Sequence, residues 1–98
     1  MYYIVWNYKV SKAGQAKFEE HYGRSGEWFK LFEPCHDYLG HELIKNTNGE
    51  GYVLIDKWMS KQTYDGFVSS NQLFYDDLNK RSKELYSEEI LIGTFETL

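Results

Sequence analysis

The sequence predicts a single α+β domain in which strands and helices follow the order βαββαβ. Segments rich in β-branched and aromatic residues alternate with segments whose apolar residues recur at helical spacing, and an Asn-Gly turn joins the two middle strands. The chain has 98 residues, so we expect one domain spanning residues 1–98. Hydrophobic residues make up 42% of it and charged residues 27%, a composition typical of a globular protein.

The first half of the chain begins with a strand at residues 2–10. Both alternating sets of side chains in this strand are largely apolar, which is typical of a strand covered on both faces. Ser11 can cap the helical segment that follows. Gly23 and Gly26 interrupt its apolar pattern, so we expect a helix, a break, and a second short helical piece ended by Pro34.

The second half begins with a β-hairpin formed by residues 38–46 and 52–59. Its turn contains Asn48-Gly49, a strong hairpin signal. Ser60 can cap a second helix, which the Ser-Ser-Asn sequence at residues 69–71 can interrupt, and a last strand is predicted at 90–97. The apolar residues expected on one side of this helix are Tyr64, Phe67, Val68, Phe74, Leu78 and Leu85.

This order of elements is typical of the ferredoxin-like class, with a four-stranded antiparallel sheet and both helices on one face. The opposite face of the sheet would then be bare. Because both side-chain sets of the first and third strands are largely apolar, that bare face would be apolar as well. An uncovered apolar sheet face predicts a homodimer, and the alternative is a monomer with an exposed apolar patch.

Composition and charge narrow the range of partners. Aromatic residues make up 18% of the chain, more than a minimal core needs, which suggests an interface, a pocket for a flat ligand, or both. The net charge of −4 and the scattered Lys and Arg residues argue against nucleic acid and against anionic membranes. The single cysteine, Cys35, excludes internal disulfides. With no apolar membrane span and no signal peptide, this predicts a cytoplasmic protein.

Residues 35–37, Cys-His-Asp, lie close to His41 and Glu42 and suggest a metal or thiol site. Adjacent residues on an extended chain point to opposite faces, so Cys35 and His36 cannot easily share one ion. A zinc site also needs about four ligands. We therefore expect no metal, and interpret this segment as a loop whose polar side chains face solvent. Phosphate loops, dinucleotide-binding glycine motifs and nucleophile elbows are absent.

Two polar residues are candidates for chemistry. Asn7 lies in the first strand among apolar neighbours, where an amide is costly unless it is hydrogen-bonded. It is either a structural amide satisfied by nearby backbone or a polar group inside an apolar pocket. Asp77 belongs to an Asp-Asp pair in the second helix, which is either a solvated helix face or, if Asp77 turns toward the sheet, a proton acceptor whose pKa is raised by burial.

Four aromatic residues are candidates for substrate binding. Residues of this kind are more often part of a core than of a ligand site. As a group they could frame a slot between the helices and the sheet. They are Tyr22, Trp28, Phe67 and Phe74.

Several segments in this order of elements also match one known family. They are Asn7 near the end of the first strand, GEWFKLF at 26–32, YLGHEL at 38–43, IDKWMS at 55–60, and Phe67. Over nearly its whole length the chain resembles the antibiotic biosynthesis monooxygenase family. The resemblance implies a dimeric α+β barrel, in which two sheets pack face to face, and a pocket in each subunit between the helices and the sheet.

The family includes cofactor-independent oxygenases acting on aromatic polyketide phenols, quinol oxygenases and haem-degrading enzymes. The haem-degrading branch resembles this chain at Asn7, and it also uses a Trp in the second helix and an iron-ligating His ten residues later. Phe67 and Asp77 occupy those two positions here. A carboxylate is a poor substitute for an imidazole ligand, which argues against haem.

The resemblance therefore implies a monooxygenase without a cofactor, acting on a small aromatic substrate such as a quinol or polyphenol. In this hypothesis Asn7 hydrogen-bonds the substrate oxygen, and Asp77 or a tyrosine accepts the proton. The alternative is a dimer of the same fold that holds a hydrophobic small molecule without transforming it.

Overall fold

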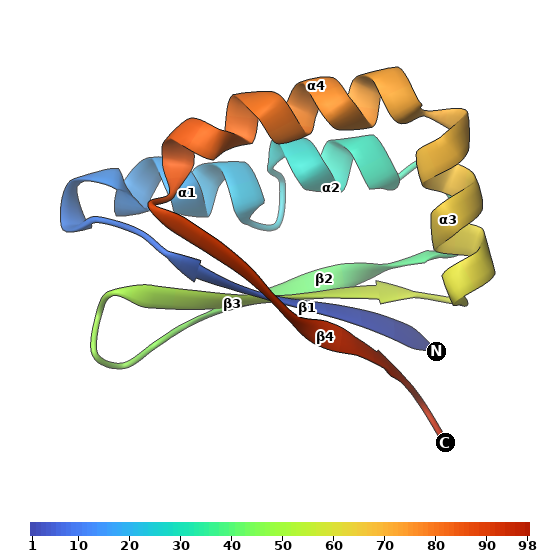
Figure 1. Ribbon diagram of the computed structural model, residues 1–98, viewed down its shortest axis with the longest axis horizontal. Coiled ribbons are helices and arrows are strands. Elements are labelled where there is room, and N and C mark those ends of the chain that lie inside the picture. The colour runs from blue at the N-terminus through green and yellow to red at the C-terminus, as the bar shows by residue number, and fades with distance from the viewer.

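The computed structural model describes residues 1–98, and its elements follow the predicted order (Figure 1). The strands and helices are β1 (Tyr2–Lys9), α1 (Gln15–Tyr22), α2 (Glu27–Phe32), β2 (Tyr38–Lys45), β3 (Gly51–Trp58), α3 (Lys61–Ser70), α4 (Gln72–Ser82) and β4 (Glu88–Glu96). Short 3-10 turns, η1 (Lys12–Gly14) and η2 (Lys83–Leu85), precede α1 and follow α4. No helix combines the length and the apolar character that crossing a bilayer requires.

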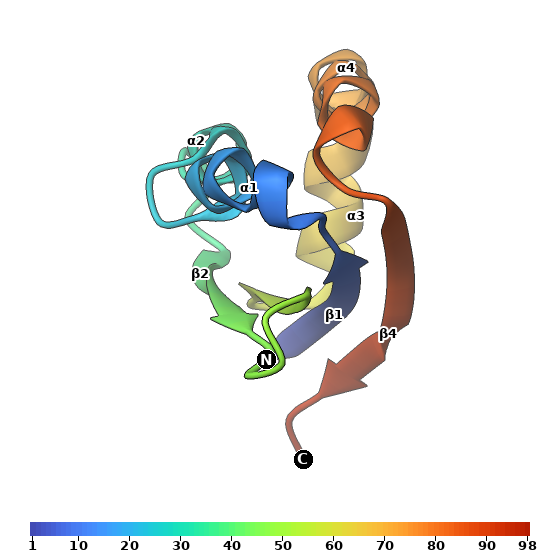
Figure 2. The ribbon, with the colours of Figure 1, turned by 90° about the vertical axis from the view of Figure 1, so that its left-hand side faces the viewer.

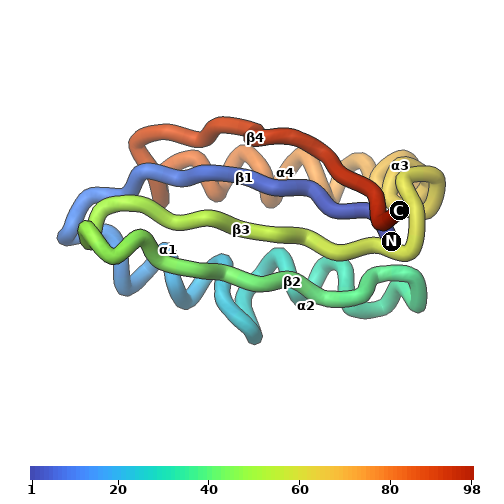
Figure 3. Tube along the Cα trace, turned by 90° about the horizontal axis from the view of Figure 1, so that it is seen from below, coloured from blue at the N-terminus to red at the C-terminus, as the bar shows by residue number.

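The four strands form one antiparallel sheet in the order β2-β3-β1-β4. All the helices lie on one face of it (Figure 1), and the view from below shows the other face with nothing in front of it (Figure 3). Seen along the strands, α1 and α2 lie above the β2 side and α4 above the β4 side (Figure 2). The predicted ferredoxin-like fold is confirmed.

Both predicted helix breaks are present. The first occurs between α1 and α2, where a Cβ atom on Gly26 would collide with the carbonyl oxygen of His21. Only glycine allows the two helices to approach so closely. The second break occurs at Asn71, whose side-chain amide donates a hydrogen bond to the carbonyl of Phe67 at 2.9 Å. Ser60 caps α3 as predicted, since its Oγ accepts a hydrogen bond from the backbone N–H of Thr63 at 3.1 Å.

The structure corrects one feature of the predicted helix. The prediction placed Phe74 on the buried side with Leu78, but the inward side of α4 is centred between Leu78 and Tyr75, which leaves Phe74 at its edge. In α4 the side chains of Tyr75, Leu78 and Ser82 are wholly or partly buried, whereas Phe74 is 71% exposed. The inward side of α4 therefore follows the spacing i, i+3, i+7 from Tyr75.

The alternation of β1 decides which side chains enter the core. Tyr2, Ile4 and Tyr8 are buried beneath the helices. Tyr3, Val5 and the residues in phase with them point to the uncovered face. The same alternation in β3 buries Tyr52, Leu54 and Trp58, and these residues lie opposite the inward residues of β1.

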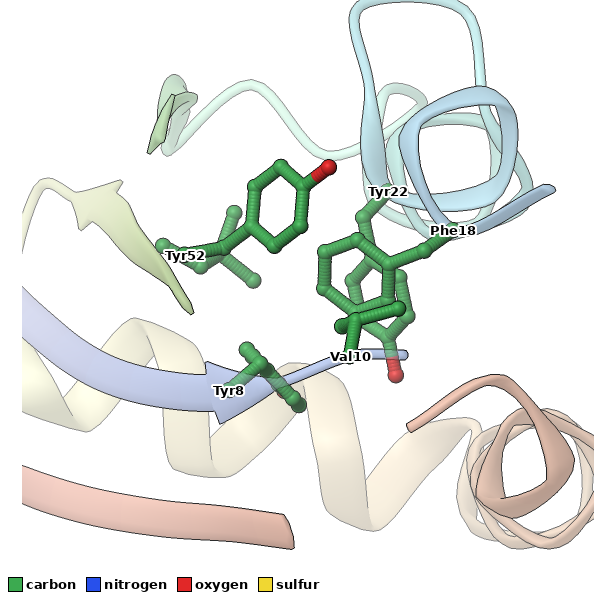
Figure 4. Close-up of a cluster of buried hydrophobic side chains, with 6 residues drawn as sticks. Tyr8, Val10, Phe18, Tyr22 and Tyr52 are labelled. Carbon is green, nitrogen blue, oxygen red and sulfur yellow. The ribbon is translucent and has the colours of Figure 1, made fainter. Parts of the chain in front are cut away.

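The core consists of two clusters of buried side chains. The first joins α1 to the sheet and contains Tyr8, Val10, Phe18, Tyr22, Tyr52 and Leu54 (Figure 4). The second contains Tyr2, Ile4, Phe32 and Trp58. Trp6 and Trp28 are only partly buried, and both pack against both clusters. The space beside these two tryptophans is where the candidate site lies.

Candidate functional site

A cavity of about 100 Å³ lies between the sheet and the helices. Most of its wall is aromatic, which is typical of a small-molecule site. The apolar lining residues are Trp6, Tyr8, Trp28, Phe32, Leu54, Tyr64 and Tyr75. The polar lining residues are Asp56, Asn79 and Glu89. The cavity thus has the position that the slot between helices and sheet was expected to have.

Asp56 is the most perturbed acidic group of the cavity. It follows Leu54 by two residues in β3, so the alternation of the strand turns it toward the helices. No hydrogen bond or ion pair holds its carboxylate. Although the cavity leaves the residue only half-buried, protein atoms surround its carboxyl group, and this burial raises the pKa from 3.8 to about 7. A carboxyl group with this pKa can both accept and release a proton near neutral pH.

The phenols around Asp56 also have raised pKa values, but for a phenol this means that it keeps its proton. Burial raises the pKa of Tyr8, Tyr64 and Tyr75 above the ordinary value of 10.0, so these phenols stay protonated at neutral pH. The hydroxyls of Tyr64 and Tyr75 lie 3.3 Å apart, and Tyr8 donates a hydrogen bond to Oε2 of Glu89 at 2.7 Å. The tyrosines can therefore donate hydrogen bonds but are poor proton acceptors.

Asn79 supplies an amide to the same cavity. It lies one turn after Tyr75 in α4, and the two side chains therefore share the inward side of the helix. A side-chain amide both donates and accepts hydrogen bonds. Asp56 and Asn79 together provide a proton acceptor and a hydrogen-bond donor in an otherwise apolar space.

A buried network holds Trp28 in the cavity wall. Its Nε1–H donates to Oγ of Ser82 at 3.1 Å, and Nε2 of His21 lies 2.7 Å from the same oxygen. Ser82 is fully buried and donates its own proton to the carbonyl of Leu78 at 2.7 Å. Ser82 must then accept from both rings, which places the proton of His21 on Nε2. Burial lowers the pKa of His21, so its ring is neutral at neutral pH.

The sequence matches no protein-family model and no curated protein. Solved structures do match. SnoaB, a cofactor-independent oxygenase from Streptomyces nogalater, is 19% identical with a TM-score of 0.74, over 99% of this chain and 92% of that one. A candidate antibiotic biosynthesis monooxygenase from Deinococcus radiodurans is 8% identical with a TM-score of 0.75, again over 99% and 92%. Another from Nitrosomonas europaea is 9% identical with a TM-score of 0.70, over 100% and 99%.

The chain has the fold of the antibiotic biosynthesis monooxygenases. This confirms the resemblance predicted from the sequence at the level of the fold, over nearly the whole chain. At these identities the likeness does not carry residue roles from those proteins to this one. The chemistry of the site rests on the residues described above.

The two residues expected to carry the chemistry, Asn7 and Asp77, both lie away from the cavity. Asn7 is one residue out of phase with Tyr8, so it points to the uncovered face, opposite Val53 and Ile90. Asp77 lies on the outside of α4, where its side chain is 67% exposed and its Oδ2 lies 3.0 Å from Nε of Arg81. Neither lines the cavity, so the hypothesis that Asn7 and Asp77 act on a substrate there is not supported, and Asp77 has the alternative placement on a solvated helix face.

The four aromatic residues expected to bind substrate lie in different surroundings. Trp28 lines the cavity. Tyr22 is buried in the first core cluster, stacked on Phe18 with ring centroids 4.4 Å apart. Phe67 packs against the second cluster, 5.7 Å from the Trp58 ring. Phe74 faces solvent, because it lies at the edge of the inward side of α4.

The polar residues of the cavity were not predicted from the sequence as site residues. Asp56 had a signal, because it interrupts the buried set of β3 at an inward position. The sequence held no such signal for Asn79, because its orientation depends on which side of α4 faces the sheet. Glu89 lies outside the strand predicted at 90–97, since β4 begins at Glu88.

The segment at Cys35–His41 forms no metal-binding group. No three His, Cys, Asp or Glu side chains converge anywhere in the structure. His41 instead lies on the inward side of β2, with its Nδ1 2.8 Å from the Tyr38 hydroxyl. A larger hollow of about 690 Å³ runs along this sheet edge, but its lining is mostly charged and polar.

Proposed function

We propose that the protein is a cofactor-independent monooxygenase acting on a small phenol or quinol held in the cavity. The observation that carries the proposal is the unpartnered carboxylate of Asp56, set among aromatic rings with a pKa near 7. SnoaB, which has the same fold, is described as a cofactor-independent oxygenase.

In the proposed reaction, the Asp56 carboxylate accepts the proton of the substrate hydroxyl. The resulting anion is electron-rich and reduces dioxygen directly. For a quinol, one oxygen atom replaces a ring hydrogen and the other leaves as water, so the ring becomes a hydroxyquinone. The substrate supplies all four electrons, and no external reductant is needed.

The other lining residues support this reaction without exchanging electrons. The amide of Asn79 is positioned to hydrogen-bond a substrate oxygen, the task expected of Asn7 from the sequence. The protonated phenols of Tyr64 and Tyr75 can donate to the reduced oxygen species. The aromatic walls limit the access of water, which strengthens the electrostatic interactions inside the cavity.

The test is oxygen uptake by the purified protein with a panel of monocyclic quinols. We expect Asp56→Asn to lower kcat about 100-fold or more, the usual contribution of a general base. Asp77→Asn is the matched control, because it makes the same change at an exposed residue. Oxygen uptake no faster than the uncatalysed background would refute the enzyme, and ligand binding without uptake would support the alternative of a binding protein.

We also propose that the protein is a homodimer whose two sheets pack face to face. The uncovered face carries apolar side chains from all four strands: Val5, Ile44, Val53, Ile55, Ile90 and Phe95. Ile44, Ile90 and Phe95 are each about half exposed in the single chain, and a contiguous apolar surface of this kind marks an interaction site. Light scattering should give twice the chain mass of 11.7 kDa, and a mass near 11.7 kDa at micromolar concentration would refute the dimer.

A further inference from the structure

We propose that the cavity is selective for charge: it favours a single-ring phenol whose opposite end carries an ammonium group, and it rejects one that carries a carboxylate. The phenol end rests on the proposed function. The preference for an ammonium group rests on Glu89, which the proposed reaction does not use.

The charges of the lining are all of one sign. Two carboxyl groups, Asp56 and Glu89, face the cavity, and no Lys, Arg or His is among its lining residues. A carboxylate ligand would bring a third acidic group into a poorly solvated space without a cation to balance it. A ligand with an ammonium group would supply the positive charge that the lining lacks.

The aromatic wall adds to the same preference. The faces of Trp and Tyr rings attract cations, and cages of such rings bind ammonium groups in other proteins. Here the rings of Trp28 and Tyr75 both line the cavity and pack edge to face, with centroids 5.4 Å apart and an interplanar angle of 70°. The Ser82 hydrogen bond fixes the orientation of the Trp28 ring.

The positions of the two carboxyl groups indicate where the polar groups of the ligand must be. Asp56 pairs with Ile4 of β1, whereas Glu89 pairs with Tyr8, four residues further along the same strand. Four residues of strand correspond to roughly 13 Å of backbone. A ligand that reaches both carboxyl groups must therefore carry its hydroxyl and its ammonium group at opposite ends of its ring. Tyr8 donates a hydrogen bond to Oε2 of Glu89, and the Tyr86 phenol also lies near this carboxylate. Both neighbours are neutral, so neither supplies the positive charge that an ammonium group would bring.

The volume of the cavity limits the ligand to one ring. A cavity of roughly 150 Å³ in another protein is known to hold benzene. The cavity here measures about 100 Å³, so one ring fills it with a small movement of the walls.

The experiment compares three ligands of nearly the same shape: 4-(aminomethyl)phenol, 4-(hydroxymethyl)phenol and 4-hydroxybenzoate. Binding is measured by calorimetry on the full chain at pH 7.5 in 0.15 M salt. We expect the amine to bind at least tenfold more tightly than the neutral alcohol, and the carboxylate to bind at least tenfold more weakly than the alcohol. Equal affinities for the amine and the alcohol, or no binding of any ligand at millimolar concentration, would overturn the inference.

Glu89→Gln is the test variant, because the amide oxygen can still accept the Tyr8 hydrogen bond. We expect it to bring the affinities for amine and alcohol within about twofold of each other. Glu88→Gln is the matched control: it makes the same change at the exposed neighbouring residue and should leave the tenfold preference intact. An equal loss in both variants would attribute the preference to the acidic surface and refute the site.

The outcome separates this inference from the proposed function. If the amine binds selectively but no oxygen is consumed, the charge selectivity stands and the oxygenase fails. If oxygen is consumed with the same KM for amine and alcohol, the oxygenase stands and the selectivity fails.

Discussion

The two faces of the sheet have similar apolar patterns but different chemistry. Tyr2, Ile4 and Tyr8 of β1 are buried beneath the helices, whereas Val5 and Asn7 of the same strand lie on the uncovered face. Because only one face is covered by the helices of the chain, only that face strongly perturbs a carboxyl group. Burial of this kind raises the pKa of Asp56 to about 7, while the uncovered face carries the proposed dimer interface.

The largest expected effect comes from placing a lysine at two neighbouring positions of β3. Leu54 is 5% exposed in the first core cluster, and Leu54→Lys should prevent folding, because a charge without a partner cannot be buried there. Ile55 points to the uncovered face, opposite Val5, and Ile55→Lys should leave the circular dichroism spectrum unchanged and produce a monomer. Unfolding of both variants, or a dimer in the second, would contradict the proposed division between the faces.

The second effect is the dependence of stability on pH, measured as the free energy of unfolding of wild type relative to Asp56→Asn. Burial raises the pKa of Asp56 from 3.8 to about 7, so between these values the folded protein holds more protons than the unfolded chain. Wild type should therefore lose stability relative to the variant as the pH rises from 4 to 7, and no more above that. Three pKa units correspond to about 4 kcal/mol, and we expect about 2 kcal/mol because the residue is only half-buried.

Comparison with the variant matters because other groups near Asp56 titrate or carry charge. They are Tyr8 of β1, Tyr38 and His41 of β2, Tyr64 of α3, Tyr75 of α4 and Glu89 of β4. Their contributions are present in both proteins and largely cancel in the difference. Asp77→Asn is the control, because it makes the same change at an exposed residue. A difference that is flat from pH 4 to 8 would mean that the Asp56 carboxyl is not buried.

A smaller effect is expected from the network behind the cavity wall. Ser82→Ala leaves the Trp28 Nε1–H and the His21 ring without their shared acceptor, which should cost about 1–3 kcal/mol in the free energy of unfolding. It should also raise KM more than it lowers kcat, since Trp28 is a wall of the proposed substrate cavity. Ser87→Ala is the matched control, because Ser87 makes an exposed hydrogen bond to the Lys9 carbonyl and its loss should cost under about 0.5 kcal/mol. Equal costs at the two serines would remove the case for the network.

The sequence predicted the fold well because local signals agreed with one another. The glycines at 23 and 26, the Asn-Gly turn and the Ser60 cap each mark a boundary that the structure confirms. The site was predicted less well, because it depends on the phase of two elements. A shift of one residue along β1 moves Asn7 to the other face, and the exact direction of the inward side of α4 decides that Asn79 faces the cavity and Phe74 does not.

The smallest expected effect tests that phase directly through two asparagines. Asn79→Ala removes the only amide in the cavity and should lower kcat/KM at least tenfold. Asn7→Ala removes an amide from the uncovered face, so it should change kcat/KM less than threefold. If Asn7→Ala instead abolished turnover while the dimer stayed intact, the amide of the uncovered face would take part in the reaction. The cavity bounded by Asp56 and Asn79 would then not be the only place where substrate meets the protein, and the division between a reactive face and an associating face would fail.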